Sequence, residues 1–138
     1  MSRSSSKPKI VILVDDQVRD LNGSALLAAH LIKLGCEVVL QPLEAYRAVI
    51  WAYKPHLILF NHLVASHLVT FSSELNSLGV KVAVLPNEGI TYREDVREFN
   101  AGKMHSKAHI DLFFCWNEKF CNALINNGFT STTKIAAV

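Results

Sequence analysis

The sequence predicts an α/β fold: a three-layer, Rossmann-like domain with a mostly parallel sheet of about six strands. Three observations predict it. Short apolar runs recur along the chain, helical periodicity fills most of the intervals between them, and Gly or Pro stands at several junctions. Strands that alternate with helices imply right-handed crossovers, which bring the strands into one parallel sheet covered by helices.

Six apolar runs are expected to be the strands. The first is residues 10–14 (Ile-Val-Ile-Leu-Val), whose β-branched residues suit a strand that is buried on both faces. Runs of the same kind lie at residues 37–40, 56–60, 80–85, 110–115 and 134–138. Such continuous apolar runs, without alternation, are typical of the inner strands of an α/β sheet.

Four of the intervals are expected to be helices. In the first, apolar residues recur at steps of three and four from Leu21 to Ile32, and Gly35 ends the helix. The others are residues 45–53, 66–78 and 118–126. Because Pro cannot continue a helix and Gly accepts a left-handed cap, Pro55 and Gly79 predict turns from helix to strand.

Two segments fall outside this alternation. Residues 1–8 are Ser-rich and basic, and they are expected to form a disordered tail ahead of one domain over residues 9–138. Residues 86–108 form a long segment of polar and irregular sequence, in which a short helix is expected near residues 93–100. Long loops in compact domains are usually functional or mobile.

Composition and charge exclude several classes of protein. The chain has 138 residues, half of them apolar, which is enough for a core without disulfides. The net charge is only +2 and no basic stripe interleaves with aromatic residues, so no nucleic-acid partner is expected. No segment is apolar for long enough to span a bilayer. We therefore expect a cytoplasmic protein, with peripheral contact at the inner membrane left open.

Cysteine, metal and cofactor chemistry are not expected. Cys36, Cys115 and Cys121 match no zinc or redox spacing, and small buried hydrophobes are the simplest interpretation. His105 and His109 would share a helical face, but no third ligand stands at a suitable spacing. No G-x-G-x-x-G follows the first strand, and no Walker lysine loop is present.

Polar residues follow the carboxyl ends of the predicted strands, where parallel sheets bind their ligands. The candidate substrate-binding residues there are Asp15, Asp16, Arg19, Asp20, Asn61, His62, Asn87 and Gly89. The second and fifth strands end at Gln41 and at Trp116 and Asn117. The alternatives are that Asp16 or Asp20 caps the first helix while Arg19 is solvated, and that His62 completes a turn instead of contacting an anion.

Glu88 is the candidate catalytic residue. It lies between Asn87 and Gly89, directly after Pro86, so the backbone is expected to turn sharply there. A carboxylate held in such a turn over a cleft can act as a general base. The alternative is that Glu88 caps the following helix.

Five segments carry a resemblance to a known family. They are Val18-Arg-Asp-Leu-Asn-Gly-Ser-Ala-Leu-Leu-Ala-Ala, Lys54-Pro-His-Leu-Ile-Leu-Phe, Gly79-Val-Lys-Val-Ala-Val-Leu-Pro-Asn-Glu-Gly, Asp111-Leu-Phe-Phe-Cys-Trp-Asn-Glu and Lys134-Ile-Ala-Ala-Val138. Together they resemble the N-terminal half of bacterial surface carbohydrate biosynthesis proteins. These are similar to two-domain glycosyltransferases of the GT-B architecture, including Kdo-transferase-like members that act in capsule and lipopolysaccharide synthesis. The resemblance covers nearly all of residues 9–138.

The resemblance implies an acceptor-side domain. It places Glu88 at the family's acidic turn facing an interdomain cleft, which Arg19 and Asp20 also line, and it implies a glycan or lipid-linked glycan acceptor. In such proteins a Gly-Asn-Pro-Arg-like segment and a C-terminal domain follow, and that domain carries most contacts to the nucleotide-sugar donor. The chain stops at Val138. No turnover is therefore expected without a C-terminal donor-binding domain or subunit, because catalysis needs both substrates held together.

Two other functions stay open on the sequence. One is a free-standing module that binds a nucleotide or a sugar phosphate. The other is a degenerate phosphorelay receiver-like domain, because Asp15 and Asp16 after the first strand look like a magnesium-binding acidic pair. A receiver also needs a phosphoacceptor Asp at the end of the third strand, where this sequence has Asn61.

Overall fold

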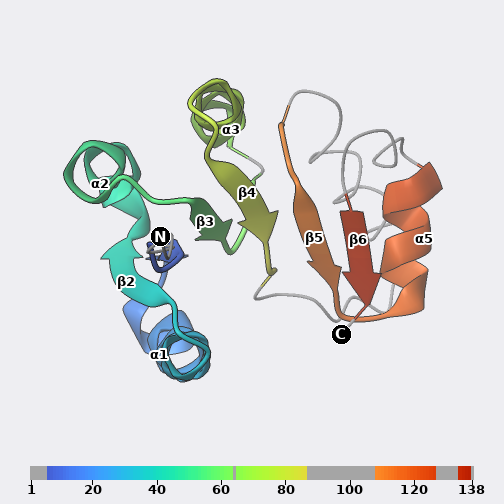
Figure 1. Cartoon of the computed structure of the whole chain (residues 1–138). Coiled ribbons are helices and arrows are strands. Elements are labelled where there is room, and N and C mark those ends of the chain that lie inside the picture. The colour runs from blue at the N-terminus through green and yellow to red at the C-terminus, as the bar shows by residue number, and fades with distance from the viewer. Residues whose placement is uncertain (1–5, 64, 87–107, 127–133, 138) are drawn as a thin grey trace, which may run out of the picture. The chain divides into compact units, whose positions relative to one another are not determined.

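The computed structural model describes residues 6–63, 65–86, 108–126 and 134–137. It is an α/β fold with a six-stranded parallel sheet in the order β2-β1-β3-β4-β5-β6 (Figure 1). The fold class predicted from the sequence is confirmed. The chain divides into two compact units, Met1–Leu59 and Phe60–Val138, and each is described by itself below.

The predicted strands and helices are present with small shifts at their ends. The first unit contains β1 (Lys9–Val14), α1 (Gln17–Lys33), β2 (Glu37–Pro42), a 3₁₀ turn (Leu43–Ala45), α2 (Tyr46–Tyr53) and most of β3 (Leu57–Phe60). The second contains α3 (Ser66–Ser77), β4 (Lys81–Val84), β5 (Leu112–Cys115), α5 (Glu118–Asn126) and β6 (Lys134–Ala137). The helix expected near residues 93–100 lies outside the described residues.

The first unit has three layers. α1 and α2 both contact β1 and β2, and they lie on opposite faces of these strands (Figure 1). The β1 residues Val11 to Val14 are at most 8% exposed, as a strand covered on both sides requires. β1 and β2 pair in register from Lys9↔Glu37 to Val14↔Pro42. The two strands therefore end level with each other, and the loops that follow them start from one edge.

The turns from helix to strand follow the predicted pattern, with one unexpected residue. Gly79 and Gly35 have φ values of +73° and +92°, the left-handed conformation of a helix C-cap. After α2, however, the left-handed residue is Lys54, with φ +51°, and Pro55 follows it. For a residue with a Cβ this conformation costs about 1 kcal/mol, so the backbone at Lys54 is mildly strained.

The second unit is centred on aromatic side chains. Phe60, Phe71 and Phe113 are almost completely buried, and Phe71 meets Phe60 edge to face with ring centroids 6.4 Å apart. α3 packs on β4, and α5 packs on β5 and β6. These contacts hold β4, β5 and β6 against the helices of the second unit.

Asp111 fixes the opposite, amino end of this unit. Its carboxylate accepts hydrogen bonds from the Val82 backbone N–H and the Lys81 Nζ, both at 2.9 Å, and His109 Nε2 lies 3.5 Å away. Burial alone would raise the pKa of Asp111, but the hydrogen bonds from Lys81 and Val82 outweigh it and lower the pKa. The carboxylate thus ties the start of β5 to β4.

Candidate functional site

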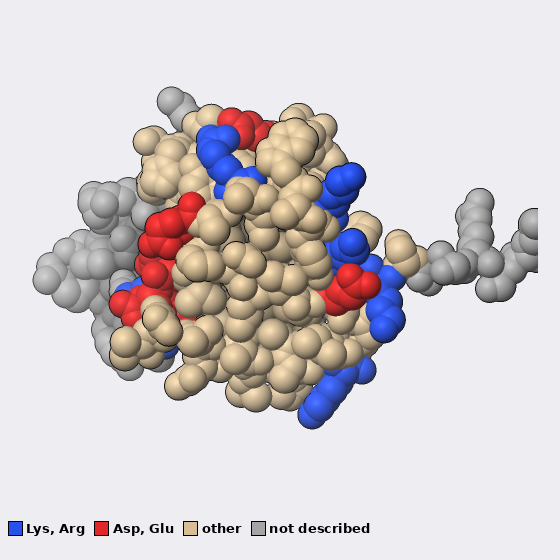
Figure 2. Space-filling view, turned by 90° about the vertical axis from the view of Figure 1, so that its left-hand side faces the viewer, with Lys and Arg blue, Asp and Glu red and all other residues tan. Residues whose placement is uncertain are grey.

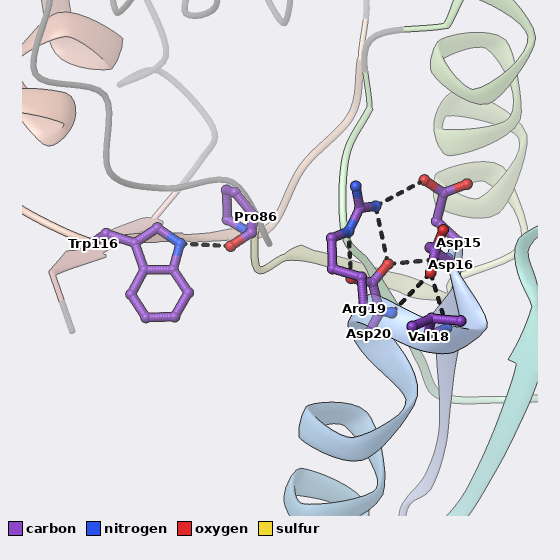
Figure 3. A network of polar contacts seen from close by, with 7 residues as sticks. All are labelled: Asp15, Asp16, Val18, Arg19, Asp20, Pro86 and Trp116. Atoms are coloured by element: carbon purple, nitrogen blue, oxygen red, sulfur yellow. Dashed lines mark hydrogen bonds and ion pairs between the residues drawn. The ribbon is translucent and has the colours of Figure 1, made fainter.

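Asp16 caps the N-terminus of α1. Its Oδ1 accepts hydrogen bonds from the backbone N–H groups of Val18 and Arg19, both at 2.8 Å (Figure 3). An extended residue with a side-chain oxygen is the arrangement that helix starts favour, because the first N–H groups have no partner inside the helix. The capping alternative for Asp16 is confirmed.

Arg19 and Asp20 continue the network. Asp20 Oδ2 accepts the backbone N–H of Asp16 at 3.0 Å, which completes a reciprocal cap. The guanidinium of Arg19 donates to both oxygens of Asp20, at 2.7 and 3.1 Å, and its Nη2 reaches Asp15 at 3.3 Å (Figure 3). The Asp20 side chain is only 3% exposed, whereas that of Arg19 is 44% exposed. Arg19 is therefore held in place, not merely solvated.

The network decides what the start of α1 can bind. A helix N-terminus after the first strand is where α/β proteins commonly bind phosphate. Here the chain's own carboxylates already accept hydrogen bonds from these N–H groups. Asp16 accepts from Val18 and Arg19, and Asp20 accepts from Asp16. Among the described residues, no group of three or more His, Cys, Asp or Glu is placed to hold a metal ion. The loop after β1 is thus closed to phosphate by its own side chains.

A cleft of about 410 Å³ lies beside this loop, at the carboxyl ends of β1 and β2. Its lining residues are Val14, Asp15, Gln17, Leu21, Leu40, Gln41, Pro42 and Glu44. In the described part of the chain, the side chains of Gln17, Gln41 and Glu44 have no hydrogen-bond or ion-pair partner. The cleft therefore combines apolar side chains with amide and carboxylate groups that have no protein partner among the described residues, a mixture that small-molecule sites also show.

Charges separate along the first unit. The carboxylates after β1 and β2 are Asp15, Asp16, Asp20 and Glu44, and the lysines at the opposite ends of strands and helices are Lys9, Lys33 and Lys54, with Glu37 beside Lys9. Figure 2 shows acidic side chains along one edge and most of the visible Lys and Arg side chains on the other, with some acidic surface among them. Arg47, in the first turn of α2, stacks on Tyr46 and does not line the cleft. The edge that carries the cleft is therefore acidic.

The second unit has its own polar residues at strand ends. Asn61, which follows β3, is buried at 7% exposure, and His62 is half-buried. Trp116, after β5, is 41% exposed and donates its indole Nε1–H to the Pro86 carbonyl after β4 (Figure 3). Asn117 accepts the Phe120 N–H at 2.9 Å and so caps α5. The exposed indole is thus held at a strand end by the neighbouring loop.

The cysteines offer no nucleophile at the strand ends. Cys115, the last residue of β5, is fully buried, as the sequence predicted, while Cys36 and Cys121 are partly exposed; all three are free thiols. Burial, followed by a hydrogen bond with Cys121, raises the pKa of the Cys115 thiol. A thiol with a raised pKa stays protonated at neutral pH and is a poor nucleophile.

The structure brings part of the predicted site together. Asp15, Asp16, Arg19 and Asp20 form one network, but Asp16 and Asp20 use their carboxylates to hold the helix start. Asn61 and His62 belong to the second unit. Asn87, Glu88 and Gly89 lie outside the described residues, so the convergence of Asp16, Arg19, His62 and Glu88 on one rim stays a prediction.

One cleft residue, Glu44, was not among the polar residues that the sequence placed at the strand ends. It was missed because β2 runs two residues beyond the predicted residues 37–40. The added residues bring Gln41 opposite Leu13 and start the next turn, with Glu44, level with the loop after β1.

Comparison of the chain with protein-family models, with curated proteins and with solved structures gave no match. In the part of the chain that the structure describes, no helix has the length and apolar character needed to cross a membrane. The resemblance to surface carbohydrate proteins therefore stays a prediction, and the geometry of the site is the main support for a function.

Proposed function

We propose that this chain is the N-terminal, acceptor-side domain of a GT-B-type glycosyltransferase that acts in surface polysaccharide biosynthesis. Three features support the proposal: the Rossmann-like parallel sheet, the polar cleft at the carboxyl ends of its first strands, and the sequence resemblance. The acceptor is a glycan or a lipid-linked glycan, and the nucleotide-sugar donor is bound by a C-terminal domain or subunit.

The observation that carries this proposal is the closed helix start at α1. A domain that bound a nucleotide or a sugar phosphate after β1 would need the N–H groups of Val18 and Arg19 to be open to the phosphate. Asp16 accepts hydrogen bonds from both groups at 2.8 Å. This disfavours the free-standing nucleotide or sugar-phosphate module and leaves the polar edge to a ligand that offers hydroxyl groups.

The chemistry assigned to the chain is limited to the acceptor. Glu88 accepts the proton of the acceptor hydroxyl as that oxygen attacks the donor sugar, which is the task of a general base. The guanidinium of Arg19, held by Asp20 and Asp15, presents its exposed side to the acceptor's hydroxyl oxygens. The leaving nucleoside phosphate is stabilised by the donor domain.

A transfer assay tests the proposal. The chain is combined with a donor-binding domain of the GT-B type, a nucleotide sugar and a polysaccharide acceptor, and transfer is expected only when both domains are present. Glu88→Gln should lower the transfer rate by about 100-fold or more while acceptor binding is retained. Glu118→Gln, which removes an exposed carboxylate at the start of α5, is the matched control and should leave transfer unchanged. Equal rates for Glu88→Gln and the unmodified chain would remove the base assignment, and absence of both transfer and glycan binding would overturn the function.

A receiver-like domain is the second candidate, because the order β2-β1-β3-β4-β5 is also that of phosphorelay receivers. Two observations count against it. Asn61 stands at the end of β3, and the Asp16 carboxylate is engaged in capping α1. Incubation with acetyl phosphate and Mg²⁺, followed by intact-mass measurement, separates the two candidates. A stable phosphoryl adduct would favour the receiver, and no adduct is expected.

A further inference from the structure

We infer that the cleft at the carboxyl ends of β1 and β2 binds one uncharged sugar ring and selects against phosphorylated or carboxylated sugars. This inference rests on the proposed function, because it names the part of the acceptor that the first unit holds. It goes further in assigning a subsite, its recognition residues and the charge of its ligand.

The size and lining of the cleft fit a single ring. A volume of about 410 Å³ lies within the usual range for small-molecule pockets. Leu21, Leu40 and Pro42 supply an apolar surface for the C–H face of a pyranose, and the polar side chains supply partners for its hydroxyl groups. All of the lining residues belong to the first unit, so the subsite is formed by residues that pack together.

Three side chains are available for recognition. Gln17 begins α1, Gln41 is near the end of β2, and Glu44 lies in the 3₁₀ turn, so the groups come from three successive elements. An amide both donates and accepts, and a carboxylate accepts, which matches sugar hydroxyls that do both. Because these side chains have no partner among the described residues, a sugar can bind by replacing water, without breaking a hydrogen bond within the described part of the protein.

Electrostatics determine the charge of the ligand. Asp15 and Glu44 line the cleft, and no Lys or Arg lining it is found in the described part of the chain. The positive end of α1 is not available to an anion, because Asp16 caps it. A phosphate or carboxylate on the sugar would therefore meet like charge with no Lys or Arg from the described lining residues to compensate it, whereas a neutral ring would not.

Nuclear magnetic resonance on the full, ¹⁵N-labelled chain tests the inference. Neutral methyl glycosides are titrated beside their 6-phosphates and the corresponding uronates, and the side-chain amide signals of Gln17 and Gln41 report on the cleft. Saturable shifts with millimolar affinity are expected for at least one neutral glycoside. Its charged counterparts should bind about tenfold more weakly or not at all.

Matched variants assign the effect to the cleft. Gln41→Ala should weaken binding of the neutral glycoside about fivefold, which corresponds to the loss of one hydrogen bond. Glu44→Gln should reduce the ratio of affinities for neutral and anionic sugars, because it removes one negative charge from the cleft. Glu37→Gln changes a carboxylate at the other end of the same strand and should change neither affinity nor preference. Thermal unfolding of each variant verifies that the fold is intact.

The outcomes separate this inference from the proposed function. If neutral glycosides shift the indole N–H of Trp116 but neither glutamine, glycan binding survives and the cleft assignment is lost. If a 6-phosphate binds the cleft as tightly as the neutral ring, the selectivity is wrong. If no carbohydrate shifts any signal, the inference falls, and a negative transfer assay beside it would overturn the proposed function as well.

Discussion

Asp20, in the first turn of α1, and Asp111, directly before β5, make the same kinds of contact in the first and the second unit. Each carboxylate accepts one backbone N–H, from Asp16 and Val82 respectively, and each pairs with a basic side chain. Asp20 is held by the two-pronged guanidinium of Arg19 and is 3% exposed, whereas Asp111 meets the single ammonium of Lys81 and is 23% exposed. The stronger network lies at the edge that carries the candidate site.

The difference shows how an acidic residue near a site can serve the fold instead of the ligand. Asp111 joins β4 and β5 at their amino ends, whereas α/β sheets bind ligands at the carboxyl ends of their strands. Asp20 organises a loop that a ligand would approach, but its oxygens are already occupied. The side chains that remain available to a ligand at this edge are Gln17, Gln41 and Glu44. They line the neighbouring cleft and make no hydrogen bond or ion pair among the described residues.

The largest effect is expected for Asp20→Ala. The change removes a buried acceptor, leaves the Asp16 N–H without its partner and removes two hydrogen bonds from Arg19, so the free energy of unfolding should fall by about 2 kcal/mol. Urea denaturation at neutral pH measures it. Asn22→Ala, at an exposed position of the same helix, is the control and should stay within about 0.5 kcal/mol of the unmodified chain. A loss for Asp20→Ala no larger than the control's would mean that the network does not hold α1.

Asp111→Asn should have a smaller effect that depends on pH. At neutral pH the variant should be about 1 kcal/mol less stable, because a charge-assisted hydrogen bond weakens. The pKa of Asp111 is lower in the folded chain than in the unfolded chain. Its contribution is therefore complete above the ordinary carboxyl pKa of the unfolded chain and is lost as the pH falls through the lower pKa of the folded chain. Urea denaturation from neutral to strongly acidic pH should show the two proteins converging at the acidic end; a difference that grows on acidification would contradict the sign.

The smallest effect is expected for Asp15→Asn. Arg19 lies 3.3 Å from Asp15, and both side chains are more than a third exposed, so solvent screens the pair and its loss should cost less than about 0.5 kcal/mol. The same denaturation experiment measures it. A loss as large as that of Asp20→Ala would mean that the exposed contact of Arg19 with Asp15 stabilises the chain as much as the buried contacts of Asp20, against the expectation from exposure.

The strands could be predicted from the sequence more fully than the packing of α1. Strands buried on both faces appear as continuous apolar runs, which is why β1 and β3 stood out. The periodic residues that predicted α1 do not all face the sheet: Ala28 is buried, but Ile32 is 54% exposed. Asp20 takes a buried position on this helix instead. A polar residue that is buried because of its hydrogen bonds cannot be recognised by hydrophobic periodicity.

The candidate site was predicted in location but only partly in detail. Parallel strands end at one edge, so Asp15 and Arg19 were placed correctly after β1 from the order of elements alone. The sequence left open whether Asp16 binds a ligand or caps the helix, because both uses need the same carboxylate. Glu44 was missed because its position depends on the register between β1 and β2, which no local pattern encodes.

The central claim is that the start of α1 is closed to phosphate by Asp16. Titration of the ¹⁵N-labelled chain with inorganic phosphate and with a nucleoside diphosphate sugar, observed at the backbone amides of Val18 and Arg19, tests it most directly. We expect no saturable shift of either amide at millimolar ligand, and a new phosphate-dependent shift in Asp16→Gly, where the N–H groups are released. Saturable shifts of both amides in the unmodified chain would contradict the account.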